Sequence, residues 1–349
     1  MQVTYARNPV QSHRPAAGAA EDGGTERREA SGEEPTDWFQ PVRDLGVVGR
    51  LLSLGLLYKG KNVARKKANA EKPPLLAEPP VTLQDPVVFV PGWTTTREAF
   101  DPLAEKLLEG GRNGGQLIFV SEGKFYVDRE CTELCDGDAL QSSKPKVFEV
   151  VYSDIRLAPD RSSEELAVNF KAIKGLTGTQ KVDVSAFSMG GLATRAYLDK
   201  GGQDIDQLLF VATPHQGAKF ADLARRTLRR DIGWAIKLAG LLPADLPALD
   251  WLAPVEDGNP QLKQLNERWE IQKSRVNETH FVAGKGTVTA RDGWWLIADG
   301  DGLVSVGSSA PPGEKSVVFD DQTHGTMNNS VPVFREMMDF FHWKAEELK

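Results

Sequence analysis

The strongest constraint on the fold is a tight turn within the stretch Ala186-Phe187-Ser188-Met189-Gly190-Gly191. Residues 181–187 alternate between charged side chains and β-branched or small apolar side chains, which is typical of a short buried strand. After the turn, apolar residues recur at helical spacing. A strand that passes directly into a helix brings the two backbones together and strains the residue between them. Residues two positions before and after Ser188 must therefore be small, and Ala186 and Gly190 meet this requirement.

Strand and helix patterns alternate through most of residues 81–349, which we expect to form one domain. The continuous apolar run at 87–90 is typical of a strand buried on both faces of a parallel sheet. The predicted strands are 87–90, 146–152, 181–187, 207–212, 278–283 and 315–319, and helices are predicted at 97–108, 163–174, after Ser188 and at 331–344. This alternation predicts an α/β fold with a mostly parallel central sheet flanked by helices.

Two segments interrupt the alternation. We interpret residues 110–146, rich in glycine and polar residues, as an insertion on the surface that holds a hairpin at 116–127. Residues 218–275 contain only helical patterns and include an apolar stretch at 234–252. This second segment is interpreted either as a helical lid or cap over the site or as ordinary helices that complete the core.

The chain before residue 81 has a different composition. Residues 1–37 lack an apolar stretch and are predicted to be disordered, whereas residues 38–80 read as an amphipathic helix and a proline-rich linker. The apolar and lysine-rich residues 45–67 could contact a membrane surface peripherally or pack on the domain. We expect no signal peptide or transmembrane helix, and hence a cytoplasmic or peripheral membrane protein, with signal-independent export left open.

Composition excludes other classes of function. The formal net charge of −7 and the lack of interleaved aromatic and basic residues argue against nucleic-acid binding. Cys131 and Cys135, the only cysteines, are too few for a disulfide framework or a structural zinc site. Two free thiols are therefore the favoured interpretation, although a local disulfide is the alternative in an oxidising compartment.

A serine placed at such a turn can act as a nucleophile only with a base within hydrogen-bond reach and a carboxylate that orients the base. His324 lies just after the last predicted strand, where a loop can bring its imidazole over Ser188. His280 falls within a strand and His342 within the terminal helix, so both are interpreted as core or surface residues. His215 lies at a strand end near the site, but it precedes any later acidic loop.

The candidate acid lies in Asp299-Gly300-Asp301-Gly302-Leu303-Val304. Asp301 is preferred and Asp299 is the close competitor, while the alternative is a glycine turn whose aspartates only stabilise the backbone.

A serine-based reaction also needs two backbone donors for the oxyanion. The amide of Met189 at the start of the helix is one candidate, and the amide of Trp93 after the first buried strand is the other. Gly92 allows the backbone to approach a substrate closely there.

Several motifs together resemble bacterial triacylglycerol lipases and related esterases of the α/β-hydrolase superfamily. These motifs are Val-Pro-Gly-Trp, Ala-Phe-Ser-Met-Gly-Gly, Ala-Thr-Pro-His-Gln-Gly, Asp-Gly-Leu-Val and a late His-Gly, between residues 81 and 343. The resemblance implies the α/β-hydrolase fold with a helical lid and a structural or supporting role for His215 beside the site. Pro91 departs from the more usual His-Gly of the oxyanion loop, and the calcium site of several secreted members is not carried over, because Gly325-Thr326-Met327 follow His324.

The sequence thus predicts a serine carboxylic-ester hydrolase, a lipase or esterase that acts on lipid-like acyl esters through an acyl-enzyme intermediate. The predicted catalytic residues are Ser188, Asp301 and His324, and no cofactor or metal is expected. A phospholipase or thioesterase with the same residues is an alternative, as is a protein that binds a lipid or a partner without turnover.

Overall fold

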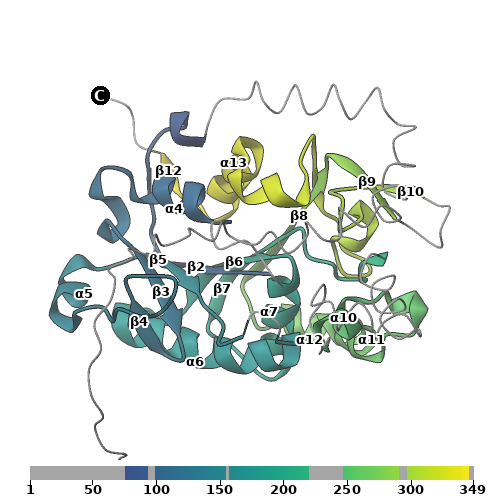
Figure 1. Cartoon of the computed structure of the whole chain (residues 1–349), viewed down its shortest axis with the longest axis horizontal. Helices are drawn as coiled ribbons and strands as arrows, with labels where there is room; N and C mark the ends of the chain where they lie inside the picture. The colour runs from purple at the N-terminus through teal and green to yellow at the C-terminus, as the bar shows by residue number, and fades with distance from the viewer. Residues whose placement is uncertain (1–74, 93–98, 155–156, 220–246, 291–296, 346–349) are drawn as a thin grey trace, which may run out of the picture.

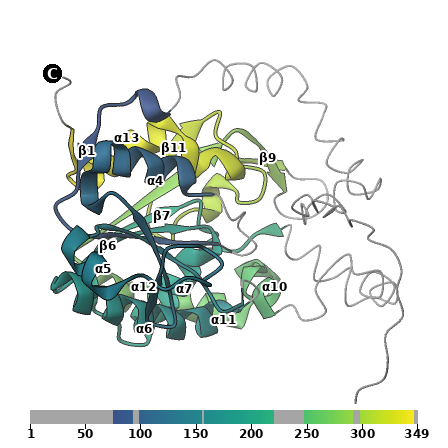
Figure 2. The same ribbon diagram turned by 60° about the vertical axis from the view of Figure 1, so that its left-hand side comes forward.

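The computed structural model describes residues 75–92, 99–154, 157–219, 247–290 and 297–345, and Figures 1 and 2 show their arrangement. Several predictions lie outside these residues. They concern the predicted disorder of residues 1–37, most of the segment 38–80 with the membrane contact proposed for 45–67, Trp93, and most of the apolar stretch 234–252.

Twelve short strands are described, and eight of them form the central sheet. The strands of the central sheet are β2 (Val87–Val90), β3 (Leu117–Ser121), β4 (Lys124–Tyr126), β5 (Val147–Val150), β6 (Val182–Phe187), β7 (Ile205–Val211), β8 (Glu278–Lys285) and β11 (Val317–Asp320). Their order across the sheet is β11-β8-β7-β6-β2-β5-β3-β4. All neighbours run parallel except β3 and β4, so the prediction of a mostly parallel sheet is confirmed.

Helices cover both faces of this sheet (Figures 1 and 2). The helices α4 (Asp101–Leu108) and α13 (Val331–Phe340) lie on one face, and α6 (Pro159–Thr177), α7 (Met189–Asp199) and α12 (Trp269–Lys273) lie on the other. The prediction that α6 begins at residue 163 is wrong. Pro159 occupies the first turn, where a proline is tolerated because its missing N–H has no partner within the helix, and the helix therefore starts earlier.

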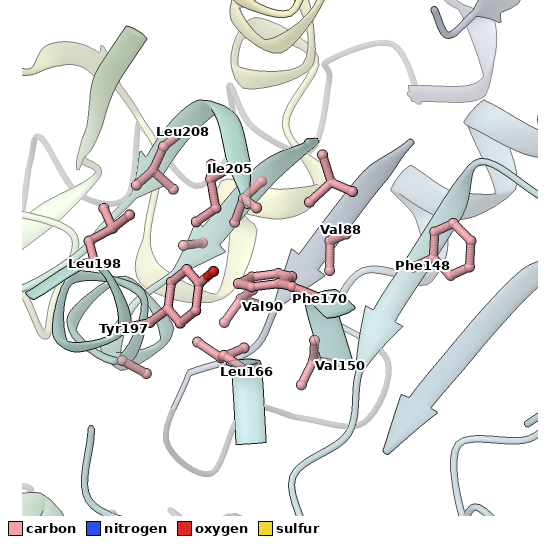
Figure 3. Close-up of a cluster of buried hydrophobic side chains, with 14 of the residues drawn as sticks. Val88, Val90, Phe148, Val150, Leu166, Phe170, Tyr197, Leu198, Ile205 and Leu208 are labelled. Carbon is pink, nitrogen blue, oxygen red and sulfur yellow. The ribbon is translucent and has the colours of Figure 1, made fainter. Parts of the chain in front are cut away.

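The covering helices explain why the central strand β2 is apolar throughout. Alternate residues of β2 point to opposite faces, so Val88 and Val90 join the cluster beneath α6 and α7 while Val87 and Phe89 join the cluster beneath α4 and α13. Figure 3 shows the first cluster, in which Phe170 of α6 packs among strand side chains. Full burial of each such side chain stabilises the fold by roughly 1.5–3 kcal/mol.

The segment 110–146 contributes to the central sheet. It contains the predicted hairpin, formed by β3 and β4, and the short helix α5 (Gly137–Ser143). Because β3 also pairs in parallel with β5, the hairpin extends the sheet and is not a separate surface excursion as the sequence was interpreted. Cys131 and Cys135, on the chain between β4 and α5, are free thiols.

The described part of segment 218–275 is helical. Besides α12 it contains α10 (Pro247–Leu252) and α11 (Pro260–Glu267). Leu249 and Leu252 of α10 pack with Met189 and Leu192 of α7 in a third apolar cluster. This part of the chain therefore lies directly against the helix that follows Ser188.

The remaining strands form two small ladders. β9 (Thr287–Ala290) and β10 (Ile297–Gly300) make an antiparallel hairpin, and β1 (Val81–Thr82) pairs with β12 (Lys344–Ala345). The predicted terminal helix therefore ends at Phe340, before β12. Among the described helices, none has both the length and the hydropathy needed to cross a membrane.

Asp183 is a destabilising group within β6. Its Oδ1 atom is buried without a hydrogen-bond partner. Burial, together with the charges of Asp85 and Asp206, raises the pKa of Asp183 to about 7. Between about pH 4 and pH 7 the folded chain therefore keeps a proton that the unfolded chain has released, and the free energy of unfolding falls as the pH rises through this window.

We expect Asp183→Asn to stabilise the fold more at about pH 8 than at about pH 5, because the amide removes a buried charge that is fully present only at the higher pH. The difference should approach ~1.4 kcal/mol for each unit over which the two states differ in protonation. Thermal unfolding followed by circular dichroism at several pH values measures it. The matched control is Asp138→Asn on the exposed surface of α5, and an equal gain at every pH contradicts the prediction.

Candidate active site

Ser188 occupies the sharp turn between β6 and α7. Its backbone angles are φ 54° and ψ −129°, a region that residues other than glycine rarely adopt. The Ser188 amide donates to the carbonyl of Val211 at 2.8 Å, which ties the turn to the end of β7. The predicted strand–turn–helix unit is therefore present, and it carries the serine at the carboxyl end of a central strand.

The small residues around Ser188 are required by close backbone contacts. A Cβ atom on Gly190 would lie 2.4 Å from the carbonyl oxygen of Pro91 and 2.6 Å from that of Val90. Gly191 similarly faces the side chain of Thr213. Ala186 is completely buried in β6, and its methyl group is accommodated there. The glycines thus let α7 start against the chain that leaves β2.

The imidazole of His324 lies beside Ser188. His324 begins the short helical turn η6 (His324–Asn329) after β11, and its Nε2 atom is 3.0 Å from the Ser188 Oγ atom. Thr323 and Thr326 exchange hydrogen bonds between side chain and backbone at the start of this turn. This reciprocal capping fixes the loop that presents the imidazole.

Asp301 accepts from the other imidazole nitrogen. Its Oδ2 atom is 2.7 Å from the His324 Nδ1 atom. Its Oδ1 atom accepts from the amides of Leu303 at 2.9 Å and Val304 at 2.7 Å, and the His324 amide donates to the Asp301 carbonyl at 2.8 Å. The carboxylate is therefore held by three contacts, a fourth joins the backbones of the two loops, and the Asp301 side chain is only 1% exposed.

Asp299 has a different environment. Its side chain is 58% exposed and forms an ion pair with Lys285 at 3.1 Å. Of the two acids that the sequence leaves in competition, the structure brings Asp301 to His324.

Glycines at the end of β8 allow these loops to meet. A Cβ atom on Gly286 would lie 2.4 Å from the backbone of Gln322, two residues before His324. A Cβ atom on Gly284 would lie 2.7 Å from the Gln322 carbonyl and 3.0 Å from the Cβ atom of Asp301. The acid loop and the histidine loop therefore both pack directly on the β8 backbone.

The other histidines near the fold's core have separate partners. His280 pairs with Glu336 of α13 at 2.6 Å. His215, completely buried after β7, has its Nδ1 atom 3.2 Å from Arg195 Nη1. Burial and the Arg195 charge hold the pKa of His215 well below its usual range, so His215 stays neutral.

Arg195 of α7 is a residue of the site region that sequence reasoning missed. Its guanidinium is fully buried and donates to Gln272 Oε1, Asn266 Oδ1 and the Leu265 carbonyl at 2.8–2.9 Å. Burial lowers the pKa of Arg195 to about 9. The network joins α7 to α11, α12 and the His215 loop, and the only signal in the sequence was a charged residue within an otherwise apolar helical pattern.

The candidate oxyanion donors are only partly described. Met189 begins α7, so its amide belongs to the first turn of the helix, whereas Trp93 lies outside the described residues. Gly92, the residue before Trp93, is buried at the end of the described chain there.

In the described parts of the chain, no cluster of three or more His, Cys, Asp or Glu side chains could hold a metal ion. The arrangement that is present joins a hydroxyl, an imidazole and a carboxylate in series. Such a series can transfer the serine proton to the imidazole while the carboxylate orients the ring.

The chain was compared with protein families, curated proteins and solved structures. No protein-family model matches the chain. Over 94 residues, or 26% of the chain, it is 31% identical to triacylglycerol lipases from Pseudarthrobacter phenanthrenivorans and Burkholderia plantarii. The chain covers only 30% and 26% of the length of these two relatives.

Two solved structures are similar over most of the chain. The product of the gene lin2722 from Listeria innocua has 18% identity and a TM-score of 0.48, and covers 76% of this chain and 95% of its own. The mature lipase BlEst2 from Bacillus licheniformis has 16% identity and a TM-score of 0.47, with coverage of 75% and 94%. Because both TM-scores are below 0.5, the fold assignment rests on the topology of the chain itself.

That topology combines a mostly parallel eight-stranded sheet, a serine turn at the end of a central strand, and an acid and a histidine on loops after later strands, in that order. The chain has the α/β-hydrolase fold and, over about a quarter of its length, resembles triacylglycerol lipases.

Proposed function

We propose that the protein is a serine hydrolase that cleaves carboxylic esters of lipid-like acids. The observation that carries the proposal is the hydrogen-bonded series of Ser188, His324 and Asp301, with distances of 3.0 Å and 2.7 Å. These three groups are far apart in the sequence and have the types and the order that nucleophilic ester cleavage requires.

In the proposed reaction the Ser188 Oγ atom attacks the ester carbonyl carbon, and His324 Nε2 takes the hydroxyl proton. The tetrahedral intermediate then collapses, the alcohol leaves with the proton from His324, and an acyl-serine remains. Water then attacks the carbonyl carbon of the acyl-serine and loses a proton to His324. The second tetrahedral intermediate collapses, the acid is released, and the Ser188 Oγ atom regains the proton from His324. Asp301 orients the ring throughout and stabilises the imidazolium that forms.

The proposed oxyanion donors are the amides of Met189 and Trp93. Met189 follows Ser188 at the start of α7, where helix N–H groups lack partners within the helix. The Trp93 assignment remains a proposal from the sequence. Two donors aimed at the developing charge lower the barrier because the interaction is strongest in the transition state.

The apolar surroundings of Met189 support a lipid-like acyl group as substrate. Leu249 and Leu252 of α10 pack with Met189 and Leu192, and Trp251 packs partly buried against the same cluster. These side chains are buried against one another beside the helix that follows Ser188, and we propose that the acyl chain binds next to this apolar cluster. Triacylglycerol, phospholipid and thioester substrates share this acyl chemistry, and the two named relatives favour the first.

Ser188→Ala should abolish hydrolysis of p-nitrophenyl esters and labelling by a fluorophosphonate probe, because both need the hydroxyl nucleophile. The matched control is Ser185→Ala in the preceding strand β6, whose buried Oγ atom has no hydrogen-bond partner. The control should fold and keep its activity. Turnover by Ser188→Ala protein, with an unchanged circular dichroism spectrum, rules out the proposed function.

Asp301→Asn should lower kcat by on the order of a thousandfold or more, because an amide no longer stabilises the imidazolium or fixes its tautomer. Asp299→Asn, the matched control, removes an exposed ion pair with Lys285 and should change kcat only slightly. Steady-state kinetics on one ester give the comparison. The opposite ranking assigns the acid to Asp299.

Binding of the acyl chain next to the apolar cluster around Met189 predicts that kcat/KM for p-nitrophenyl esters rises with acyl length from acetate to octanoate. Each added methylene that is buried contributes up to about 0.8 kcal/mol. The same series, with a triacylglycerol and a phospholipid included, compares the candidate head groups. A preference for acetate over every longer chain contradicts the assignment of a lipid-like substrate.

A further inference from the structure

The ring of Phe187 forms one side of the His324 environment. Phe187 is the last residue of β6, directly before Ser188, and its side chain is almost fully buried. The centroid of its ring is 4.8 Å from the centroid of the imidazole, with 38° between the two planes. One strand end therefore supplies both the serine and an aromatic surface for the imidazole that approaches it.

A second layer of aromatic residues supports Phe187. Phe100, just before α4, meets Phe187 edge to face at 6.4 Å and 84°. Phe100 also stacks on Phe89 of β2 at 5.0 Å and 7°. Dense packing of this kind leaves the Phe187 ring little freedom to turn away from His324.

Ion pairs hold the start of α4 in place behind these rings. Asp101, next to Phe100, pairs with Arg129, whose guanidinium also donates to Glu149 of β5 at 3.1 Å and 3.0 Å. The Arg129 guanidinium lies 4.8 Å from the centroid of the Phe119 ring. Arg129 of the segment 110–146 thereby fixes the start of α4, which carries Phe100 next to Asp101.

An aromatic face affects the two forms of the imidazole differently. Its electron-rich surface attracts a cation within about 6 Å, and it gives no comparable electrostatic attraction to a neutral ring. In the proposed reaction the imidazole of His324 becomes cationic when it takes the serine proton. A contact that strengthens as this charge develops favours the transition state over the ground state.

Charged and titratable groups contact His324, lie on its own loop, or lie on β8 and β10 near the loop of Asp301. Asp301 and Ser188 contact its two nitrogens, Lys285 and Asp299 form an ion pair on β8 and β10, and Asp320 and Asp321 precede it on its own loop. All of these remain when Phe187 is replaced, so a substitution there isolates the contribution of the ring.

We propose that Phe187 is a positioning residue that holds the imidazole of His324 toward Ser188 and stabilises its protonated form during catalysis. The inference rests on the proposed ester hydrolysis.

The test compares Phe187→Leu and Phe187→Tyr with the wild type in pH profiles of kcat and kcat/KM for a p-nitrophenyl ester. Loss of the ring should move the midpoint of the acid limb to lower pH by about half a unit to one unit, because the imidazolium loses an attraction. The plateau should fall about threefold to tenfold, in kcat more than in KM, since the lost contact acts mainly in the transition state. Phe187→Tyr keeps the aromatic face and should keep the wild-type midpoint.

The matched control is Phe148→Leu. Phe148 is a fully buried phenylalanine of β5 in the apolar cluster on the other face of the sheet, and its ring packs against that of Phe125. This substitution loses similar packing but should leave the acid-limb midpoint where it is in the wild type. A shift of the same size in Phe148→Leu protein overturns the inference, because it assigns the effect to general loosening.

A second measurement needs no turnover. The imidazole signals of His324, followed by nuclear magnetic resonance as a function of pH, should titrate at lower pH in Phe187→Leu than in the wild type. Absence of any Ser188-dependent hydrolysis refutes the proposed function alone, and the ring titration still reports on the Phe187 contact. Ser188-dependent hydrolysis with wild-type midpoints in both measurements for Phe187→Leu overturns the inference alone.

Discussion

The strained conformation of Ser188 is the constraint on which the rest of the site depends. A residue other than glycine in such a backbone region costs on the order of 1–3 kcal/mol, so the surrounding structure must impose it. The pairing of β6 with β2 and β7 holds the end of the strand in the position that imposes this conformation. Because Gly190 has no side chain, α7 can begin in contact with the carbonyls of Val90 and Pro91. The position of the Ser188 hydroxyl therefore depends on both the strand pairing in the sheet and the packing at the start of α7.

The order of elements and the three groups of the candidate triad were predictable because their signals are local. Ser188, Asp301 and His324 each follow a recognisable strand or turn, and the carboxyl ends of parallel strands meet at one edge of a sheet. Which of Asp299 and Asp301 contacts His324 could not be decided from the sequence. Both acids flank Gly300, and only their contacts, with Lys285 in one case and with His324 in the other, separate them.

Features that depend on distant partners were not predictable. Arg195 has a charge that normally marks a solvent-exposed helix position, yet its partners Asn266 and Gln272 come from a later part of the chain and bury it. The position of the strand β3 in the sheet also depends on a partner that is distant in the sequence. Its hairpin was visible in the sequence, but its pairing with β5 depends on a crossover that local patterns do not encode.

The ladder between β1 and β12 has a topological consequence. Val81 and Thr82 lie opposite Ala345 and Lys344, and Glu78 pairs with Arg335 of α13 at 2.7 Å. The described residues at 78–82 therefore lie beside those at 335 and 344–345, outside the eight-stranded sheet. Because neither β1 nor β12 belongs to the eight-stranded sheet, this ladder joins the first and last described strands without contributing to the strand order of that sheet.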